Sequence, residues 1–504
     1  MTAQALGALV DPFRWWSTLT PDKVAIIDRA RGTRATYREV DEAAARWASM
    51  LRAHGVGRGD RVALIAMNRI EIIGLFYGCV RLGAALVPLN WRLAEPELVR
   101  VVADARVKLL LGESRFAAVG RALGEAPYID FDEAVAEAAT LERAPALPLG
   151  AAQIDGEAIA LVLYTSGSTG KPKGAMLSNR QLLFNALATN TGWQLRSDDI
   201  GPISTPFFHT GGWNVIAIPL WVAGGTVVMF DAFDPARFLD VLDEERVSIA
   251  FAVPTQFVML AAQPNFGRPL PHLRNFMSGG APLPRSVADR VRAGGYAIRE
   301  GFGMTEFGVN CFMISDAEAL ARPGSVGWPM PFVEMRLVDA AGNDVATGEA
   351  GEILLRGPQL FSGYLFDAER TAEVMTADGW YRSGDLAMRD AEGAFYIRGR
   401  SKHMFISGGE NVFPGEVEAA LTECGGVSEA VVVGVPDERW GEVGHCFVFP
   451  RAGAALDGAA VLAELRTRIA AYKVPKHITV LAEPPRLASG KLDRAQLEAM
   501  TGTR

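Results

Sequence analysis

Short apolar runs alternate with helix-like stretches through most of this 504-residue chain, and this alternation restricts the fold more than any other feature. Residues 61–67 (RVALIAM) read as a buried strand, and residues 69–83 (RIEIIGLFYGCVRLG) follow with the apolar spacing of a helix. Strands that alternate with helices build layered α/β folds whose sheets are mostly parallel. The strand-like pattern returns at residues 158–164, 225–230 and 247–253.

The pattern changes near residue 334. The segments EMRLVD, GEILLRG and GAFYIRG are separated by turns rich in glycine and aspartate, as in antiparallel hairpins. The stretch that follows GRSKHM is long enough for a small α/β domain, and residues 461–472 within it are helix-like. Because 504 residues are too many for one core, we predict an α/β protein with two parts. Residues 1–399 form a large domain of layered α/β subdomains plus a β-rich subdomain, and residues 400–504 form a small α/β domain.

Charge and composition disfavour several classes of function. The chain has 50 Lys and Arg against 58 Asp and Glu, a net charge of −8, which argues against nucleic acid or an acidic membrane as the main partner. Its cysteines show no metal-like spacing and suit a reducing compartment. The first residues lack a signal-peptide pattern, and the longest apolar run, residues 215–230, is broken by proline and glycines. We therefore expect a cytoplasmic protein without an integral membrane segment.

The segment YTSGSTGKPKG, residues 164–174, has the composition of a phosphate-binding loop. It follows a buried strand, and α/β proteins bind ligands at strand ends. Its hydroxyls, glycine amides and lysines can hold a polyphosphate. It is not a Walker loop, because Gly167 and Gly170 are too close together and Pro172 follows Lys171. The alternatives are a solvated linker and a nucleotide loop of another design.

Further motifs identify a resemblance that spans nearly the whole chain. The loop is similar to the signature loop of the acyl-adenylate-forming (AMP-binding) superfamily, which includes acyl-CoA synthetases, peptide adenylation domains and firefly-type luciferases. The other motifs stand in the family's order: PFFHTGGW, SGGAPLP, GFGMTE, GEILLRGPQLFSGY, GWYRSGDL, GRSKHMFISGGENVFP and PRLASGKLDR. An ordered set of this size is specific to the superfamily.

The resemblance implies a reaction in two steps. A carboxylate attacks the α-phosphate of magnesium-bound ATP to give acyl-AMP and pyrophosphate, and the thiol of coenzyme A then displaces AMP. ATP, Mg²⁺ and coenzyme A are therefore the expected cofactors and co-substrates. The site must neutralise charge, because an anion approaches a triphosphate. The triphosphate would lie against Thr165, Ser166, Gly167, Ser168, Thr169, Gly170 and Lys173.

The same resemblance assigns the other nucleotide contacts. Glu306 would bind Mg²⁺, for which one carboxylate suffices when phosphates and water complete the shell, and Thr305 would contact the α-phosphate. Asp385 would accept both ribose hydroxyls, with Arg400 beside it. Taken alone, Glu306 reads as a surface carboxylate and Asp385 as part of a turn. The adenine would lie against Gly279, Gly280, Ala281, Gly301, Phe302, Gly303 and Met304, and Phe302 stands where many relatives have tyrosine.

The resemblance also implies that the small domain moves between the two steps. Lys491 would stabilise charge on the carboxylate and α-phosphate during adenylation, although a lone lysine in SGKLDR otherwise reads as a solvated tail residue. Its distance in sequence from the other groups requires a hinge near residues 400–403, with Lys402 at the hinge position. Rotation would withdraw Lys491 and open a channel for coenzyme A beside Gly408 and Gly409. His403 departs from the acidic residue common at its position.

The acid and its acceptor are less constrained. His209 would gate the acyl channel or position the carboxylate, and a buried structural histidine is the alternative. The mostly apolar pocket candidates favour a fatty or aromatic monocarboxylic acid. An enzyme that loads a carrier protein, a luciferase-like oxygenase and a non-catalytic nucleotide-binding protein remain alternatives, and a homodimer remains open. The pocket candidates are Phe207, His209, Gly211, Trp213, Val309 and Asn310.

Overall fold

The computed structural model describes residues 9–142, 153–165, 172–400, 403–407, 410–437, 440–487 and 492–502. Its largest sheet has six strands in the order β10-β9-β5-β4-β6-β7, parallel except for the antiparallel edge strand β10. These strands are almost continuously apolar because both faces of a parallel sheet are covered. Their bounds are β4 (Arg61–Ile65), β5 (Ala85–Pro88), β6 (Leu109–Gly112), β7 (Tyr128–Asp130), β9 (Ile159–Thr165) and β10 (Lys173–Ser178).

Two further sheets complete the layered α/β part. One has the order β11-β12-β2-β3, with strands β11 (Ile200–Ile203), β12 (Thr226–Met229), β2 (Val24–Asp28) and β3 (Thr33–Thr36). The other is parallel, β13 (Ile249–Ala252), β14 (Asn275–Ser278) and β15 (Ile298–Glu300). The strands predicted from the apolar runs are thus present, with ends within two residues of the predicted ones. Short pairs are β1 (Leu9–Val10) with β8 (Gln153–Ile154) and β16 (Phe312–Met313) with β17 (Trp328–Pro329).

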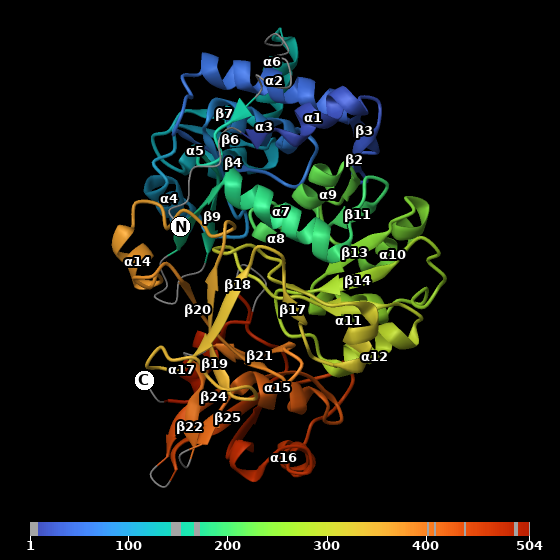
Figure 1. Ribbon diagram of the computed structural model, residues 1–504, viewed down its shortest axis with the longest axis vertical. Coiled ribbons are helices and arrows are strands. Elements are labelled where there is room, and N and C mark those ends of the chain that lie inside the picture. Colours follow the sequence, from blue (N-terminus) through green and yellow to red (C-terminus); the bar gives the residue numbers. More distant parts are fainter. Residues whose placement is uncertain are drawn as a thin grey trace.

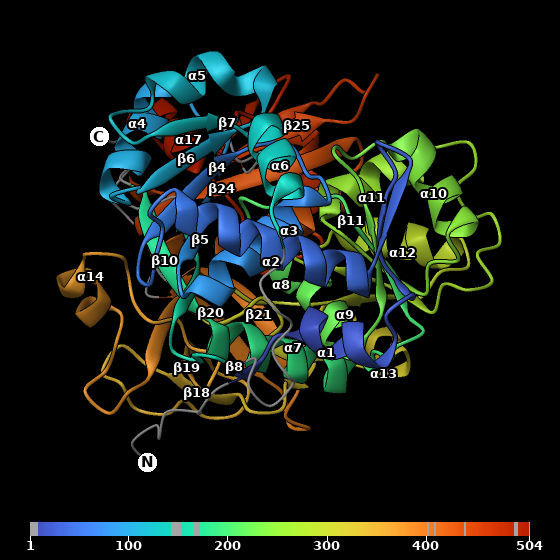
Figure 2. The same cartoon turned by 90° about the horizontal axis from the view of Figure 1, so that it is seen from above.

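Helices cover these sheets. Figure 2 shows α2 (Tyr37–Ala53) and α3 (Glu71–Leu82) lying side by side. A capping box fixes the start of α2, because Thr36 Oγ1 accepts from the Glu39 N–H and the Glu39 carboxylate accepts from the Thr36 N–H. The other helices are α1 (Pro12–Leu19), α4 (Glu95–Asp104), α5 (Ala117–Ala122), α6 (Phe131–Thr140), α7 (Asn179–Trp193), α8 (Thr210–Asn214), α9 (Ala217–Ala223), α10 (Pro235–Glu244), α11 (Pro254–Ala261), α12 (Arg285–Ala293), α13 (Asp316–Ala321) and α14 (Ala368–Glu373).

The predicted β-rich subdomain is an antiparallel meander. Strands β18 (Glu334–Val338), β19 (Ala350–Arg356), β20 (Tyr381–Arg389) and β21 (Phe395–Arg400) are neighbours in that order. The turns between them contain the glycines and aspartates that marked this region in the sequence. The last strand, β21, ends at Arg400, where we predict the hinge.

The chain after residue 403 builds a separate sheet, at the lower end of the molecule in Figure 1. Its strands are β22 (Phe405–Ser407), β23 (Glu410–Val412), β24 (Val427–Asp437), β25 (Gly441–Pro450) and β26 (His477–Val480), packed with α15 (Pro414–Thr422), α16 (Gly458–Leu465) and α17 (Arg494–Met500). The helix predicted over 461–472 ends earlier, at Leu465. After Leu465 the N–H groups of Thr467 and Arg468 donate to carbonyls three residues earlier, so the chain continues in tighter turns rather than in the α-helix.

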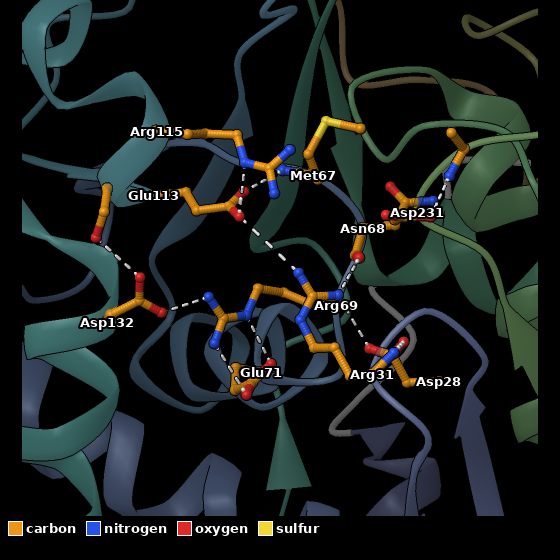
Figure 3. A network of polar contacts seen from close by, with 12 residues as sticks. Asp28, Arg31, Met67, Asn68, Arg69, Glu71, Glu113, Arg115, Asp132 and Asp231 are labelled. Atoms are coloured by element: carbon orange, nitrogen blue, oxygen red, sulfur yellow. Dashed lines mark hydrogen bonds and ion pairs between the residues drawn. The ribbon is translucent and has the colours of Figure 1, made fainter.

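The side-chain amide of Asn68 helps to connect the first two sheets. Asn68, which follows β4 and is buried, donates from Nδ2 to the carbonyls of Thr205 (3.1 Å) and Phe230 (3.3 Å). Those residues follow the ends of β11 and β12. Figure 3 shows Asn68 beside Arg31, which donates to its backbone carbonyl at 3.1 Å. The carboxyl ends of strands from two sheets are therefore held at one level, where α/β proteins bind ligands.

Candidate active site

Lys173 and Glu306 lie on either side of one tyrosine. The Tyr364 hydroxyl donates a 2.9 Å hydrogen bond to Glu306 Oε1, and the Lys173 ammonium lies 5.0 Å from the centre of the Tyr364 ring. Burial lowers the pKa of Lys173, and Arg370 acts in the same direction while the Glu306 carboxylate opposes them. The structure therefore brings the predicted phosphate-binding lysine and the predicted magnesium ligand together.

Residues 361–365 supply the backbone frame of this arrangement. The Phe361 N–H donates to the Glu306 carbonyl at 2.8 Å, and the Leu365 N–H donates to the Gly174 carbonyl at 2.8 Å. One short segment thus bonds both to the loop that carries the carboxylate and to β10, which begins at Lys173. Backbone bonds of this kind fix the spacing of two side chains that come from distant parts of the sequence.

The loop GFGMTE leaves the end of β15 and folds back on itself. The Met304 N–H donates to the Gly308 carbonyl at 2.9 Å, which closes a tight turn around Thr305 and Glu306. Gln181 on α7 donates from Nε2 to the Thr305 carbonyl at 3.1 Å. The side chains of Thr305 and Glu306, both predicted to be catalytic, are half-buried. The two hydrogen bonds described above anchor the backbone that carries them.

The predicted adenine contacts gather at the ends of β14 and β15. Added to Gly279, a Cβ would lie 3.3 Å from the Gly301 carbonyl oxygen, so the two glycine segments approach closely. Gly280 has a φ of +83°, which favours glycine, and both Gly280 and Ala281 are exposed. Phe302 is half-buried against the core. A flat ring can approach exposed backbone of this kind closely.

Asp385 and Arg400 are cross-strand partners on β20 and β21. Arg400 Nε lies 2.7 Å from Asp385 Oδ1, and the Asp385 side chain is 7% exposed while that of Arg400 is 49% exposed. Burial raises the pKa of Tyr381, with Glu306 and Tyr364 adding to the effect and Arg400 opposing it. The charges of both the Glu306–Tyr364 pair and the Asp385–Arg400 pair therefore act on the Tyr381 phenol.

The segment predicted to line the acyl pocket is hydrogen-bonded to Asn68. Asn68 Oδ1 accepts from the Phe207 N–H at 3.1 Å, so this amide also holds the segment PFFHTGGW. His209 precedes α8, and its ring centre lies 4.6 Å from that of Phe208. Trp213 is fully buried and donates from Nε1 to the Phe207 carbonyl at 2.6 Å. The indole N–H thus holds the backbone of the segment at Phe207.

Asn310 is also a buried support. Its Nδ2 donates to Thr189 Oγ1 at 2.8 Å and to the Val215 carbonyl at 3.2 Å. Val309 and Gly211 are half-buried, and the Val309 N–H donates to a buried asparagine on α7 at 3.2 Å. The structure therefore places Asn310 and Trp213 behind the pocket segments, and Val309 and Gly211 nearer to the surface.

Several predicted residues lie outside the described part of the chain, and their roles stay predictions. They are the loop residues Ser166, Gly167, Ser168, Thr169 and Gly170, the hinge residue Lys402, the channel residues Gly408 and Gly409, and Lys491. Thr165, the first loop residue, ends β9 and is half-buried.

A magnesium ion would need oxygens from the nucleotide here. Across the described residues, no three His, Cys, Asp or Glu side chains are grouped so that they could hold a metal ion. Mg²⁺ in nucleotide enzymes is commonly bound through one or two carboxylates plus phosphate and water oxygens. The single half-buried carboxylate of Glu306, beside a lysine suited to phosphate, fits that donor set.

The four cysteines are buried, and burial raises the pKa of each thiol, to about 12 for Cys446. Cys311 lies beside a predicted adenine contact, because its N–H donates to the Phe302 carbonyl at 3.0 Å, and the Asp385 carboxylate adds to the upward shift of its pKa. The thiols therefore stay protonated at neutral pH, as expected of structural cysteines.

Within the described part of the chain, no helix has the length and apolar character that crossing a membrane requires.

Sequence reasoning missed Tyr364, Tyr381 and Gln181 as members of the site. Tyr364 is the final letter of the quoted motif GEILLRGPQLFSGY, and Tyr381 lies within GWYRSGDL, so the motifs contained the signal. A tyrosine that ends a motif beside a turn is a reasonable candidate for a polar contact. Gln181 carried no such signal, because it lies on a helix between motifs.

Comparisons with known proteins agree with this geometry. The chain is 39% identical to a feruloyl-CoA synthase of Amycolatopsis sp over 96% of this chain and 97% of that protein. It is 38% identical to an indoleacetate–CoA ligase of Aromatoleum aromaticum, over 94% of both. The structure superposes on the o-succinylbenzoate CoA synthetase of Bacillus subtilis in complex with its acyl-adenylate intermediate, with a TM-score of 0.88, 29% identity, and coverage of 98% and 99%. Residues 13–365 match the family described as AMP-binding enzyme, and residues 416–491 match the AMP-binding enzyme C-terminal domain. The chain therefore belongs to the AMP-binding enzyme family, as an acyl-CoA synthetase.

Proposed function

We propose that this acid–CoA ligase activates an aromatic monocarboxylic acid with ATP and transfers it to coenzyme A. The observation that carries the proposal is the Lys173–Tyr364–Glu306 arrangement, together with the Asp385–Arg400 pair. It joins a cation and a carboxylate suited to magnesium-bound phosphates with a carboxylate suited to ribose. The preference for an aromatic acid over a fatty acid rests on the names of the two relatives above.

In the first step, the site must lower the repulsion between the acid and the triphosphate. Lys173 would neutralise the leaving phosphates. Glu306 would hold magnesium, which would supply positive charge to polarise the phosphate groups. Asp385 would fix the ribose, so that the α-phosphate meets the acid carboxylate in a constant orientation. The acid itself would lie along the segment from Phe207 to Trp213, whose position Asn68 fixes.

In the second step, the small domain would rotate at residues 400–403, and Lys491 would leave the site. The chain passes from β21 into the sheet after residue 403 through this short connection, so a few backbone angles suffice for the rotation. Gly408 and Gly409 would then border the route of the thiol. We retain a homodimer and a cytoplasmic location as parts of the proposal. Light scattering of the purified protein and cell fractionation test them.

A substrate panel tests the proposal directly. AMP and pyrophosphate release would be measured with a hydroxycinnamic acid, indoleacetic acid, a long-chain fatty acid and a dicarboxylic acid, each with and without coenzyme A. We expect the largest kcat/KM for an aromatic monocarboxylic acid and thioester only with coenzyme A. Faster turnover of the fatty acid would contradict the substrate assignment. Pyrophosphate release without thioester would contradict coenzyme A as the acceptor.

A further inference from the structure

Tyr364 occupies a position that the reaction scheme leaves without a role. It is 5% exposed, and its two chemically distinct parts face different charged groups. Its hydroxyl donates to Glu306 Oε1 at 2.9 Å, and its ring lies under the Lys173 ammonium at 5.0 Å. Tyrosine is suited to such a place because it joins an aromatic face, which attracts cations, to a hydroxyl donor.

The hydroxyl is a permanent donor in this place. A tyrosine hydroxyl keeps its proton in the neutral range, so the Tyr364 hydroxyl donates this bond to Glu306. A hydrogen bond to one carboxylate oxygen restrains the rotation of the group, and with it the direction of the second oxygen. The bond therefore determines where Glu306 can offer an oxygen to a cation.

The backbone around Tyr364 is held as firmly as its side chain. The Tyr364 N–H donates to Thr371 Oγ1 at 2.9 Å, and Tyr364 pairs with Ala175 of β10 in an antiparallel bridge. Through the neighbouring residues, the same segment bonds to the Glu306 and Gly174 carbonyls. The ring is thus fixed relative to both of the groups that it touches.

We propose that Tyr364 is a positioning residue for magnesium–nucleotide binding, which orients the Glu306 carboxylate through its hydroxyl and the Lys173 ammonium through its ring. The inference rests on the proposed roles of Glu306 and Lys173. It predicts that the hydroxyl matters for the metal-dependent first step and not for thioester formation, which needs no triphosphate. The ring matters for the lysine and hence for the affinity for the nucleotide.

The variant Tyr364→Phe removes only the hydroxyl and keeps the ring over Lys173. We expect the Mg²⁺ concentration for half-maximal acyl-AMP formation to rise about tenfold, the usual effect of one hydrogen bond to a charged group. Conversion of supplied acyl-AMP and coenzyme A to thioester should stay at the wild-type rate. Tyr396→Phe is a matched control, because the Tyr396 hydroxyl also donates to a carboxylate, Asp390 Oδ2 at 3.2 Å, on the same sheet. This control should leave the Mg²⁺ requirement unchanged.

A binding measurement separates this inference from the proposed function. Titration calorimetry with a non-hydrolysable ATP analogue at low and high Mg²⁺ requires no acid and no turnover. Tyr364→Phe should weaken binding at low Mg²⁺ about tenfold and recover at high Mg²⁺, even if the acid is misassigned. In a Glu306→Gln background, the added Tyr364→Phe change should have no further effect, because both act through one carboxylate.

Three results would overturn the inference. The first is an unchanged Mg²⁺ dependence in Tyr364→Phe. The second is an equal loss in both half-reactions together with a lower unfolding temperature, which would indicate a purely structural tyrosine. The third is full additivity of the Tyr364→Phe and Glu306→Gln effects, which would show that the hydroxyl does not act through the carboxylate.

Discussion

Replacing Gly303 by alanine should disable the GFGMTE loop, because the backbone of the following turn leaves no space for a methyl group. A Cβ on Gly303 would lie 2.6 Å from the Gly308 carbonyl oxygen and closer still to the carbonyl of Val309. The first distance falls about 0.8 Å short of the 3.4 Å at which ordinary contact begins, and the obstructing atoms are backbone. The turn that carries Thr305 and Glu306 must therefore open.

The expected magnitude follows from that displacement. Overpacking of this kind destabilises a protein by about 1–3 kcal/mol. A shift of catalytic groups on the order of 1 Å can lower a rate by about a hundredfold. We therefore expect Gly303→Ala to unfold at a lower temperature and to release pyrophosphate about a hundred times more slowly than the wild type at saturating acid and ATP.

Thermal unfolding without nucleotide and initial rates of pyrophosphate release measure the two effects. Gly301→Ala is the matched control for stability, because its Cβ would lie 3.6 Å from the Ser278 carbonyl oxygen, an ordinary contact distance. It should unfold at the wild-type temperature. Wild-type stability and rate in Gly303→Ala would refute the argument, and so would equal destabilisation of the two variants.

Three further predictions concern other parts of the molecule. Lys491→Ala should abolish acyl-AMP formation but still convert supplied acyl-AMP and coenzyme A to thioester. Assays of the two separate half-reactions test this. An equal loss of both half-reactions would contradict a rotation of the small domain between the two steps. Burial raises the pKa of the Glu300 carboxyl to about 7, although the Leu283 N–H and Arg292 lower it. Between pH 4.5, the ordinary pKa of the group, and about pH 7, folded Glu300 therefore keeps a proton that the unfolded chain loses. The free energy of unfolding should therefore fall as pH rises from about 4.5 to about 7, and Glu300→Gln, compared by denaturant titration across this range, should reduce that slope. Asn68→Ala should lower the free energy of unfolding by about 1–3 kcal/mol for each buried backbone group left unpaired, and an unchanged denaturation midpoint would count against its linking role.

The sheets could be predicted from sequence because their strands are buried on both faces. Residues 61–67 and 158–164 contain runs of apolar residues with no polar alternation, and both became central strands, β4 and β9. The meander could be predicted because its turns contain glycine and aspartate at regular intervals. The end of the helix at Leu465 could not, because no proline or glycine follows it within residues 466–472.

From the sequence, individual site residues could be proposed only where they lie in a motif that is associated with a chemical role. The contacts between them could not be predicted. The pairing of Asp385 with Arg400 depends on the register of β20 and β21, which shifts at an irregularity between Leu386 and Ala387. Nothing in the local sequence fixes such a shift. The contact between Tyr364 and Glu306 depends on residues 361–365 joining the edge of β10, which is a tertiary event. Burial of Trp213 and Asn310 likewise follows from packing, whereas the sequence shows only that they are near the pocket motif.

The burial of the thiols protects the protein from being acylated by its own intermediate. An acyl-adenylate is a mixed anhydride, and it acylates any thiolate that it meets. Cys311 is bonded through its N–H to the carbonyl of Phe302, a predicted adenine contact, yet its thiol is buried and protonated. The protein thus generates a reactive acyl donor while offering it no competing sulfur nucleophile of its own among the residues described, and the thiol that arrives from outside is the one that reacts.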